Sequence, residues 1–120
     1  MKGIFIDPFN KTIKEVILTE NYKDIQVMLD CLNFDVVGVA GLSGIKEIKE
    51  SEDLFIDGKG LDKSPTRYFK WGDRVFAGKG LILAHTITGQ IIDTSVKIET
   101  IEDTIEFLSE GYIKNTIYLI

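Results

Sequence analysis

The tetrapeptide Gly-Lys-Gly-Leu occurs twice in this chain, at residues 58–61 and 78–81, and each copy borders a strand-like run. Paired glycines permit positive φ angles and a close approach of the backbone, so each copy predicts a tight turn. Such turns can bind an anion, with the lysine adding charge, and they are also ordinary connections between strands. Short strands without regular intervening helices argue against a doubly wound parallel sheet.

The N-terminal part predicts a β-hairpin followed by a helix. Residues 3–7 and 12–18 are rich in β-formers and are separated by a turn that begins with Asp-Pro. Asn21 is suited to cap a helix over residues 22–32, and Asn33 is suited to end it in the left-handed conformation. The apolar stripe of this helix has the spacing i, i+3, i+4 and i+7 at Ile25, Met28, Leu29 and Leu32.

The middle of the chain predicts mainly strands. Residues 35–40 form a continuous β-branched run typical of a buried strand, and a flexible turn over residues 41–44 follows it. Residues 45–53 have a mixed pattern that predicts no single structure. Residues 62–67 are polar and contain a proline, which indicates an exposed loop. Strands of a small antiparallel meander are expected at residues 54–57, 68–71, 81–88 and 90–93.

The C-terminal part predicts a second helix over residues 100–110. Thr100 can cap it, Ile101, Ile105 and Leu108 supply its apolar stripe, and Gly111 can end it. The apolar tail at residues 116–120 is expected to pack as a strand or to join an interface. The sequence therefore predicts a single α+β domain over residues 1–120, in which a mostly antiparallel sheet is covered by two helices.

Composition limits the classes of function. The chain has 19 acidic and 14 basic residues, a formal net charge of −5, which argues against a nucleic-acid partner. The N-terminus reaches a turn too early for a signal-peptide core, and the apolar runs are too short to span a bilayer. Cys31 is the sole cysteine, which excludes an intrachain disulfide and cysteine-pair zinc sites. We therefore expect a cytoplasmic protein without a membrane partner, a metal or a cofactor.

No set of residues in the sequence has the pattern of a catalytic site, and a non-enzymatic role is favoured. His85 is the single histidine, and a hydrolase using it as a general base would need an orienting carboxylate. Asp57, Asp73 and Asp93 are candidates, but no spacing links them to His85. Alternation along its strand places His85 on the same face as two leucines, which favours a structural role.

The two glycine turns give one candidate ligand site. They lack the Lys-Ser/Thr pair and the following helix of a P-loop, so they are weak nucleotide motifs. A small phosphorylated ligand remains an alternative function, with turn amides and lysines as its binding groups. The residues of this candidate site are Gly58, Lys59, Gly60, Gly78, Lys79 and Gly80.

An aromatic and basic segment gives a candidate protein interface. Tryptophan, tyrosine and arginine frequently supply the binding energy of interfaces, although the same pattern fits a strand with one buried side. A protein partner is the favoured hypothesis, and a homodimer is compatible with it. The interface residues we expect are Arg67, Tyr68, Trp71, Arg74, Tyr118 and Ile120.

The motifs Phe-Ile-Asp-Gly-Lys-Gly-Leu at residues 55–61 and Phe-Ala-Gly-Lys-Gly-Leu at residues 76–81 also suggest an origin. Together with Tyr68-Phe69, this pattern resembles small uncharacterised proteins encoded by bacteriophages, plasmids and similar mobile elements. The resemblance covers the middle and C-terminal half of the chain. It implies no residue roles, but it implies a genomic setting in which an inhibitor of a host defence system is a reasonable function.

Overall fold

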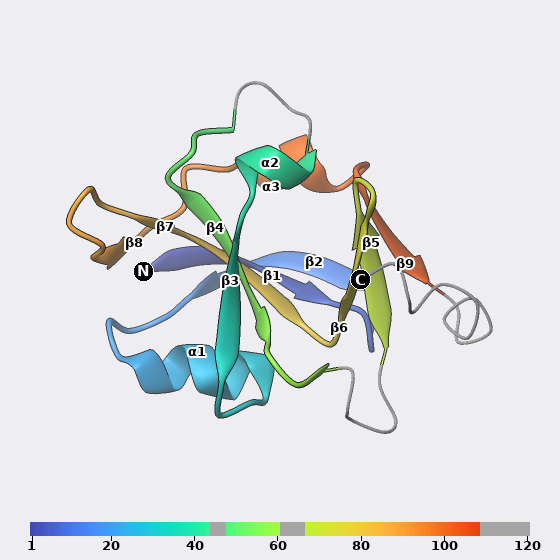
Figure 1. Cartoon of the computed structure of the whole chain (residues 1–120), viewed down its shortest axis with the longest axis horizontal. Coiled ribbons are helices and arrows are strands. Elements are labelled where there is room, and N and C mark those ends of the chain that lie inside the picture. The colour runs from blue at the N-terminus through green and yellow to red at the C-terminus, as the bar shows by residue number, and fades with distance from the viewer. Residues whose placement is uncertain (44–47, 61–66, 109–120) are drawn as a thin grey trace.

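A β-hairpin opens the chain, as its two β-rich runs predict. The computed structural model describes residues 1–43, 48–60 and 67–108, and within them β1 (Lys2–Asp7) pairs with β2 (Thr12–Ile17) (Figure 1). Asp7 is buried and holds the turn, because its carboxylate accepts hydrogen bonds from the amides of Phe9 at 3.0 Å and Asn10 at 3.3 Å. The hairpin prediction is confirmed.

The hairpin forms part of a large antiparallel sheet. Its described strand order is β2-β1-β7-β4-β3, and the short strand β8 also pairs with β7. The four strands added to the hairpin are β3 (Phe34–Gly38), β4 (Glu52–Asp57), β7 (Gly80–His85) and β8 (Ile91–Ile92). Strands that adjoin in this sheet come from distant parts of the sequence, so its order cannot be read from local pattern.

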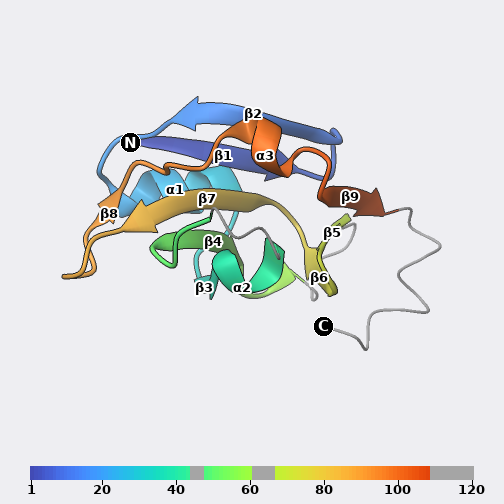
Figure 2. The ribbon, with the colours of Figure 1, turned by 90° about the horizontal axis from the view of Figure 1, so that it is seen from above.

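A smaller antiparallel sheet packs on one face of the large sheet. Its order is β6-β5-β9, and Figure 2 shows its strands grouped at one end of the long strands. The strands of this small sheet are β5 (Tyr68–Trp71), β6 (Arg74–Ala77) and β9 (Ile105–Leu108). Phe69, Trp71 and Phe76 from this sheet join one core cluster with Ile4 and Ile82 of the large sheet.

The opposite face of the large sheet is covered by α1 (Tyr22–Leu29). Ile25 and Leu29 from α1 pack into a second core cluster with Phe55 and Leu81. Asn21 caps the helix, as predicted, because its side-chain oxygen accepts a hydrogen bond from the Lys23 amide at 2.9 Å.

A carboxylate ties the start of α1 to the preceding strand. Asp24 accepts hydrogen bonds of 2.7 Å from both the hydroxyl and the amide of Thr19. These hydrogen bonds lower the pKa of Asp24 below its usual value. The position of α1 over the sheet is thereby fixed at its first turn.

The predicted second helix is wrong in most of its length. Residues 98–101 form only the short helix α3 (Ile98–Ile101), and Ile105–Leu108 form β9, which pairs with β5. The apolar residues that suggested a helical stripe also fit a strand, since Ile105 and Phe107 pack on one core cluster while Leu108 packs into another. The α+β class and the antiparallel sheet are confirmed, whereas coverage by two helices is not.

Two further local predictions are wrong. The run at residues 35–40 was expected to be a buried strand, but β3 lies at the edge of the large sheet, where Asp35 and Val36 are exposed. The predicted turn over residues 41–44 overlaps the short helix α2 (Ala40–Ser43). Residues 44–47, most of the loop at 62–67, the end of the second predicted helix and the tail at 116–120 lie outside the described residues.

Close contacts at two glycines hold the sheets together. A Cβ atom at Gly80 would lie 2.9 Å from Cζ of Phe69 and 3.0 Å from a methyl group of Leu54. A Cβ atom at Gly60 would lie 2.4 Å from the carbonyl oxygen of Ala77. These glycines of the repeated tetrapeptide are therefore needed for packing, because any larger residue would push the two sheets or their turns apart.

We predict that Gly60→Ala and Gly80→Ala each lower the free energy of unfolding by about 1–3 kcal/mol, the usual effect of overpacking. Gly38→Ala is the matched control, since a Cβ there meets nothing within 4 Å. It should be neutral or stabilising by about 0.4–1 kcal/mol. Urea unfolding measures all three, and equal stability of the Gly60 and Gly38 variants would contradict this role.

Candidate functional site

The structure brings the two Gly-Lys-Gly turns together. The first turn follows β4 and the second precedes β7, and these strands are antiparallel neighbours with Ile56 opposite Gly80. The close approach of Gly60 to Ala77 places the turns in contact. The six residues predicted to bind a ligand therefore lie at one end of the large sheet.

Three amides of these turns are already hydrogen bonded within the protein. The Gly58 amide donates to the Asn33 carbonyl at 3.0 Å, and the Gly78 amide donates to the Arg67 carbonyl at 2.7 Å. The Lys59 amide donates to Asp57 Oδ1 at 2.9 Å. An anion at these turns would therefore depend mainly on the lysine side chains. Of these, Lys79 has its Nζ 5.7 Å from the ring centre of Phe9.

The predicted protein interface divides into buried and exposed residues. Tyr68 and Trp71 are buried in the small sheet, and Trp71 has no exposed surface. Arg67 is half-buried and Arg74 is exposed, with its guanidinium 5.1 Å from the ring centre of Phe76. Tyr118 and Ile120, the two remaining interface residues, lie outside the described residues. The aromatic members of the segment thus belong to the core.

His85 has a carboxylate partner that the sequence did not suggest. Its Nδ1 lies 2.5 Å from Oδ2 of Asp53, a residue of the neighbouring strand β4. The side chain of His85 is 40% exposed and that of Asp53 is 13% exposed. This arrangement orients the imidazole ring as a general base requires, but neither residue lines the groove described below.

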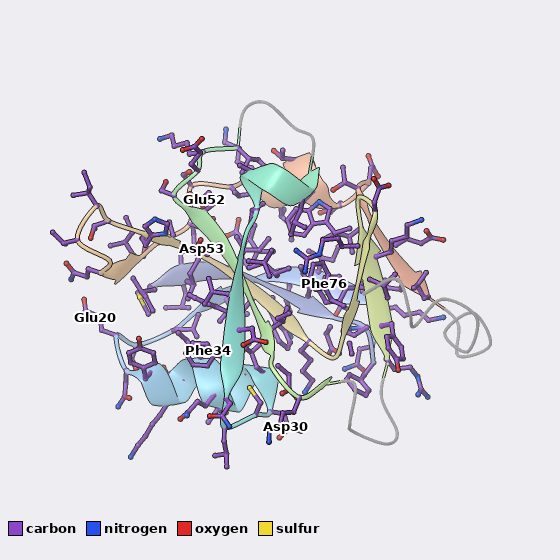
Figure 3. All side chains as sticks on the ribbon, viewed as in Figure 1. Glu20, Asp30, Phe34, Glu52, Asp53 and Phe76 are labelled. Atoms are coloured by element: carbon purple, nitrogen blue, oxygen red, sulfur yellow. The ribbon has the colours of Figure 1, made fainter. Side chains whose placement is uncertain are left out.

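Next to Asp53, Glu52 points to the other face of β4 and has a structural role (Figure 3). It is 1% exposed, and its carboxylate accepts hydrogen bonds from the Thr94 hydroxyl and from the amide and hydroxyl of Ser95. Buried carboxylates need such donors to remain stable. Glu52 therefore fastens the segment between β8 and α3 to the large sheet.

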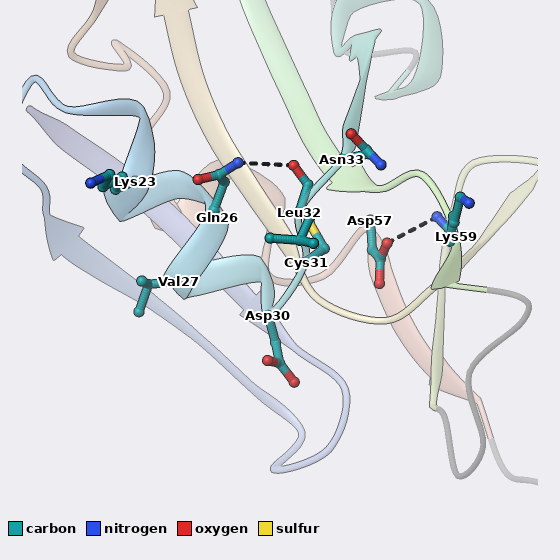
Figure 4. Close-up of a pocket in the computed structure, with 9 residues that line it drawn as sticks. All are labelled: Lys23, Gln26, Val27, Asp30, Cys31, Leu32, Asn33, Asp57 and Lys59. Atoms are coloured by element: carbon teal, nitrogen blue, oxygen red, sulfur yellow. Dashed lines mark hydrogen bonds between the residues drawn. The ribbon is translucent and has the colours of Figure 1, made fainter.

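A groove lies between the C-terminal half of α1 and the first Gly-Lys-Gly turn (Figure 4). Its volume is about 700 Å³. We call it the α1–turn groove, and its lining residues are Lys23, Gln26, Val27, Asp30, Cys31, Leu32, Asn33, Asp57 and Lys59. Sequence analysis identified only Lys59 of this set as a functional residue.

The groove exists because α1 ends one turn earlier than its apolar stripe predicts. Asp30, not Asn33, adopts the left-handed conformation with φ 54°, and its amide donates to the carbonyls of Gln26 and Val27. Leu32 therefore leaves the helical stripe and is 82% exposed. The Gln26 side chain donates to the Leu32 carbonyl at 2.9 Å, which holds Leu32 at the edge of the groove.

No family model, curated protein or solved structure matches this chain. In the described ranges, no helix combines the length and apolar character needed to cross a bilayer. Among the same residues, no three side chains of the metal-binding types converge on one point. The argument for function therefore rests on the geometry and chemistry of the surface.

The surface of the groove combines apolar side chains with charges of both signs, since Asp30 and Asp57 line it as well as Lys23 and Lys59. Val27 is 75% exposed, and together with Leu32 it presents apolar surface to solvent. Lys23 and Lys59 are exposed at its rim, and neither ammonium group forms an ion pair with a carboxylate of the described residues. The groove thus offers apolar contacts beside two lysines and two aspartates.

We predict that Trp71→Ala destabilises the folded protein. Removing a fully buried tryptophan should lower the free energy of unfolding by about 3–5 kcal/mol. Arg74→Ala, in the same segment, is the control and should lose less than about 1 kcal/mol, the value of an exposed cation–π contact. Thermal and urea unfolding test this, and a Trp71→Ala variant as stable as Arg74→Ala would contradict the core assignment.

Proposed function

We propose that this chain is a non-enzymatic protein-binding module that holds a segment of a partner protein in the α1–turn groove. The observation that carries the proposal is the exposure of Val27 and Leu32 at 75% and 82% on either side of the end of α1. Adjacent exposed apolar residues beside a concave surface are typical of interaction sites. Their burial by a partner would remove this apolar surface from water.

The openness of the groove favours a protein segment over a small molecule. Small-molecule sites enclose most of the ligand surface, and their apolar side chains are largely buried before binding. In the α1–turn groove the apolar side chains project into solvent. A peptide chain or helix laid across them can cover both at once, which a small ligand cannot do.

The charges at the rim specify the chemistry of the segment. Lys23 lies on α1 and Lys59 on the first glycine turn, so they border the groove from its two sides. A segment with apolar residues flanked by aspartate or glutamate would complement them.

The resemblance to proteins of mobile elements gives the proposal its specific form. We propose that the partner is a cytoplasmic host protein, with inhibition of a defence system as the consequence of binding. The proposal does not require Tyr68 or Trp71 at the interface. The proposed binding surface is the α1–turn groove and not the aromatic and basic segment.

We predict that random-sequence peptides selected on the immobilised protein are apolar with acidic flanks. Leu32→Ser and Val27→Ser should each weaken the best peptide about tenfold, which corresponds to ~1.4 kcal/mol of lost apolar contact. Lys59→Gln should weaken it less and reduce the salt dependence of binding. Fluorescence anisotropy with labelled peptide measures each dissociation constant.

The matched control is Ile87→Ser. Ile87 is a fully exposed apolar residue in the turn between β7 and β8, away from the groove. Its substitution should leave peptide affinity unchanged. Equal loss in the Ile87 and Leu32 variants, or no enrichment of any peptide, would contradict the proposed function.

A small phosphorylated ligand is the second candidate, favoured by the contact between the two glycine turns. It predicts that Lys79→Ala weakens binding of a nucleotide about 10- to 150-fold, since a charged hydrogen bond contributes about 1.5–3 kcal/mol. Calorimetry with a panel of nucleotides tests this. Absence of heat across the panel would remove this candidate and leave the protein-binding proposal intact.

A further inference from the structure

Among the described residues, no strand pairs with the outer side of β3 in the large sheet. This strand is the last of the described order, and it pairs with β4 from Phe34 opposite Asp57 to Gly38 opposite Asp53. The Val39 amide donates to Glu52 and the Gly58 amide donates to Asn33, which fixes the hydrogen-bonded pairs of this ladder. Because such pairs alternate along antiparallel strands, the amides and carbonyls of three residues point away from β4. These residues are Phe34, Val36 and Gly38.

The β3 edge carries a single charged side chain, that of Asp35. Sheet edges are commonly blocked by charged residues, proline or bulges. On β2, the opposite edge of the sheet, Lys14 and Glu15 are exposed. On β3, the three residues with outward-pointing amides are uncharged, and Val36 is 52% exposed.

We propose that the β3 edge pairs with the β3 edge of a second copy, in an antiparallel arrangement with the two-fold axis at Val36. The large sheets of the two copies then become one continuous sheet. In this register Val36 lies opposite its own counterpart, and Phe34 lies opposite Gly38 of the second copy. All five residues of each strand are paired.

Side-chain size supports this register. A Cβ atom at Gly38 would meet nothing within 4 Å, so the face of the sheet is open at that position. An aromatic ring beside a strand glycine covers its exposed backbone. Phe34 of the second copy is placed to do this, and its ring already stacks on Tyr22 with centroids 5.8 Å apart.

Charge and strand length exclude the neighbouring registers. A shift of the second strand by two residues in one direction places Asp35 opposite Asp35, where like charges repel. A shift in the other direction leaves Phe34 without a strand partner, because β3 ends at Gly38. In the proposed register Asp35 faces Val37, so no like charges are directly opposed.

The proposal is independent of the α1–turn groove. Val36 and Gly38 do not line that groove, so the two surfaces can be tested separately. Asp53, which is opposite Gly38 on β4, lies beside the new interface together with its partner His85. The interface would thus place the stacked rings of Tyr22 and Phe34 of one copy near the His85–Asp53 pair of the other.

Sedimentation velocity of the full chain over a concentration series tests the dimer. We expect a concentration-dependent dimer for the wild type and a monomer for Val36→Lys and Val36→Pro. Proline at this position removes an amide that β4 does not use, and circular dichroism verifies that the variant is folded. Ile17→Lys, at an 81% exposed site on the β2 edge, is the control and should still dimerise. A wild type that is monomeric throughout, or a dimer that persists in Val36→Lys, would overturn the proposal.

Cross-linking tests the register. In a Cys31→Ser background, Val36→Cys should oxidise to a covalent dimer, because the Cα atoms of a hydrogen-bonded pair lie about 5.5 Å apart, within the Cα range of a disulfide. Asp35→Cys, one residue away, should remain monomeric, since its counterpart lies too far along the strand. Equal cross-linking of the two variants would overturn the register.

Discussion

The contact between the Phe69 ring and Gly80 is the constraint on which the rest of the structure depends. Gly80 begins β7, the central strand of the large sheet, and pairs with Ile6 on one side and Ile56 on the other. The missing side chain lets the small sheet approach, which completes the core around Trp71. The same end of β4 then carries the first glycine turn to the C-terminal end of α1, where the groove forms.

The sequence predicted elements whose signals are local. The hairpin, the start of α1 at Asn21 and the glycine turns depend on residues close in the chain, and the structure has each of them. The predicted end of α1 at Asn33 is wrong, because a left-handed Asp30 ends the helix before Leu32 can join the buried stripe. The local pattern of residues 105–108 favours a helix. They form β9 instead, because this strand gains its stability from pairing with β5, which is distant in sequence.

The candidate site was less predictable than the fold. Lys59 of the first turn was predicted as a binding residue. The α1–turn groove that it lines depends on the exposure of Leu32, which follows from the early end of α1. The partner of His85 is 32 positions away, and only the register of β4 and β7 brings Asp53 to it. Trp71 is of a residue type that is common at interfaces. Pairing on both sides of β5 and packing against the large sheet place it in the core instead.

The central claim is that a partner segment occupies the α1–turn groove through Val27 and Leu32. Methyl-resolved NMR tests it most directly, by titrating the labelled protein with a selected peptide and following the valine, leucine and isoleucine methyl groups. The account predicts that the methyl signals of Val27 and Leu32 shift, while those of the exposed Ile17 and Ile87 stay in place. Binding that shifts Ile17 or Ile87 and leaves Val27 and Leu32 unchanged would contradict it.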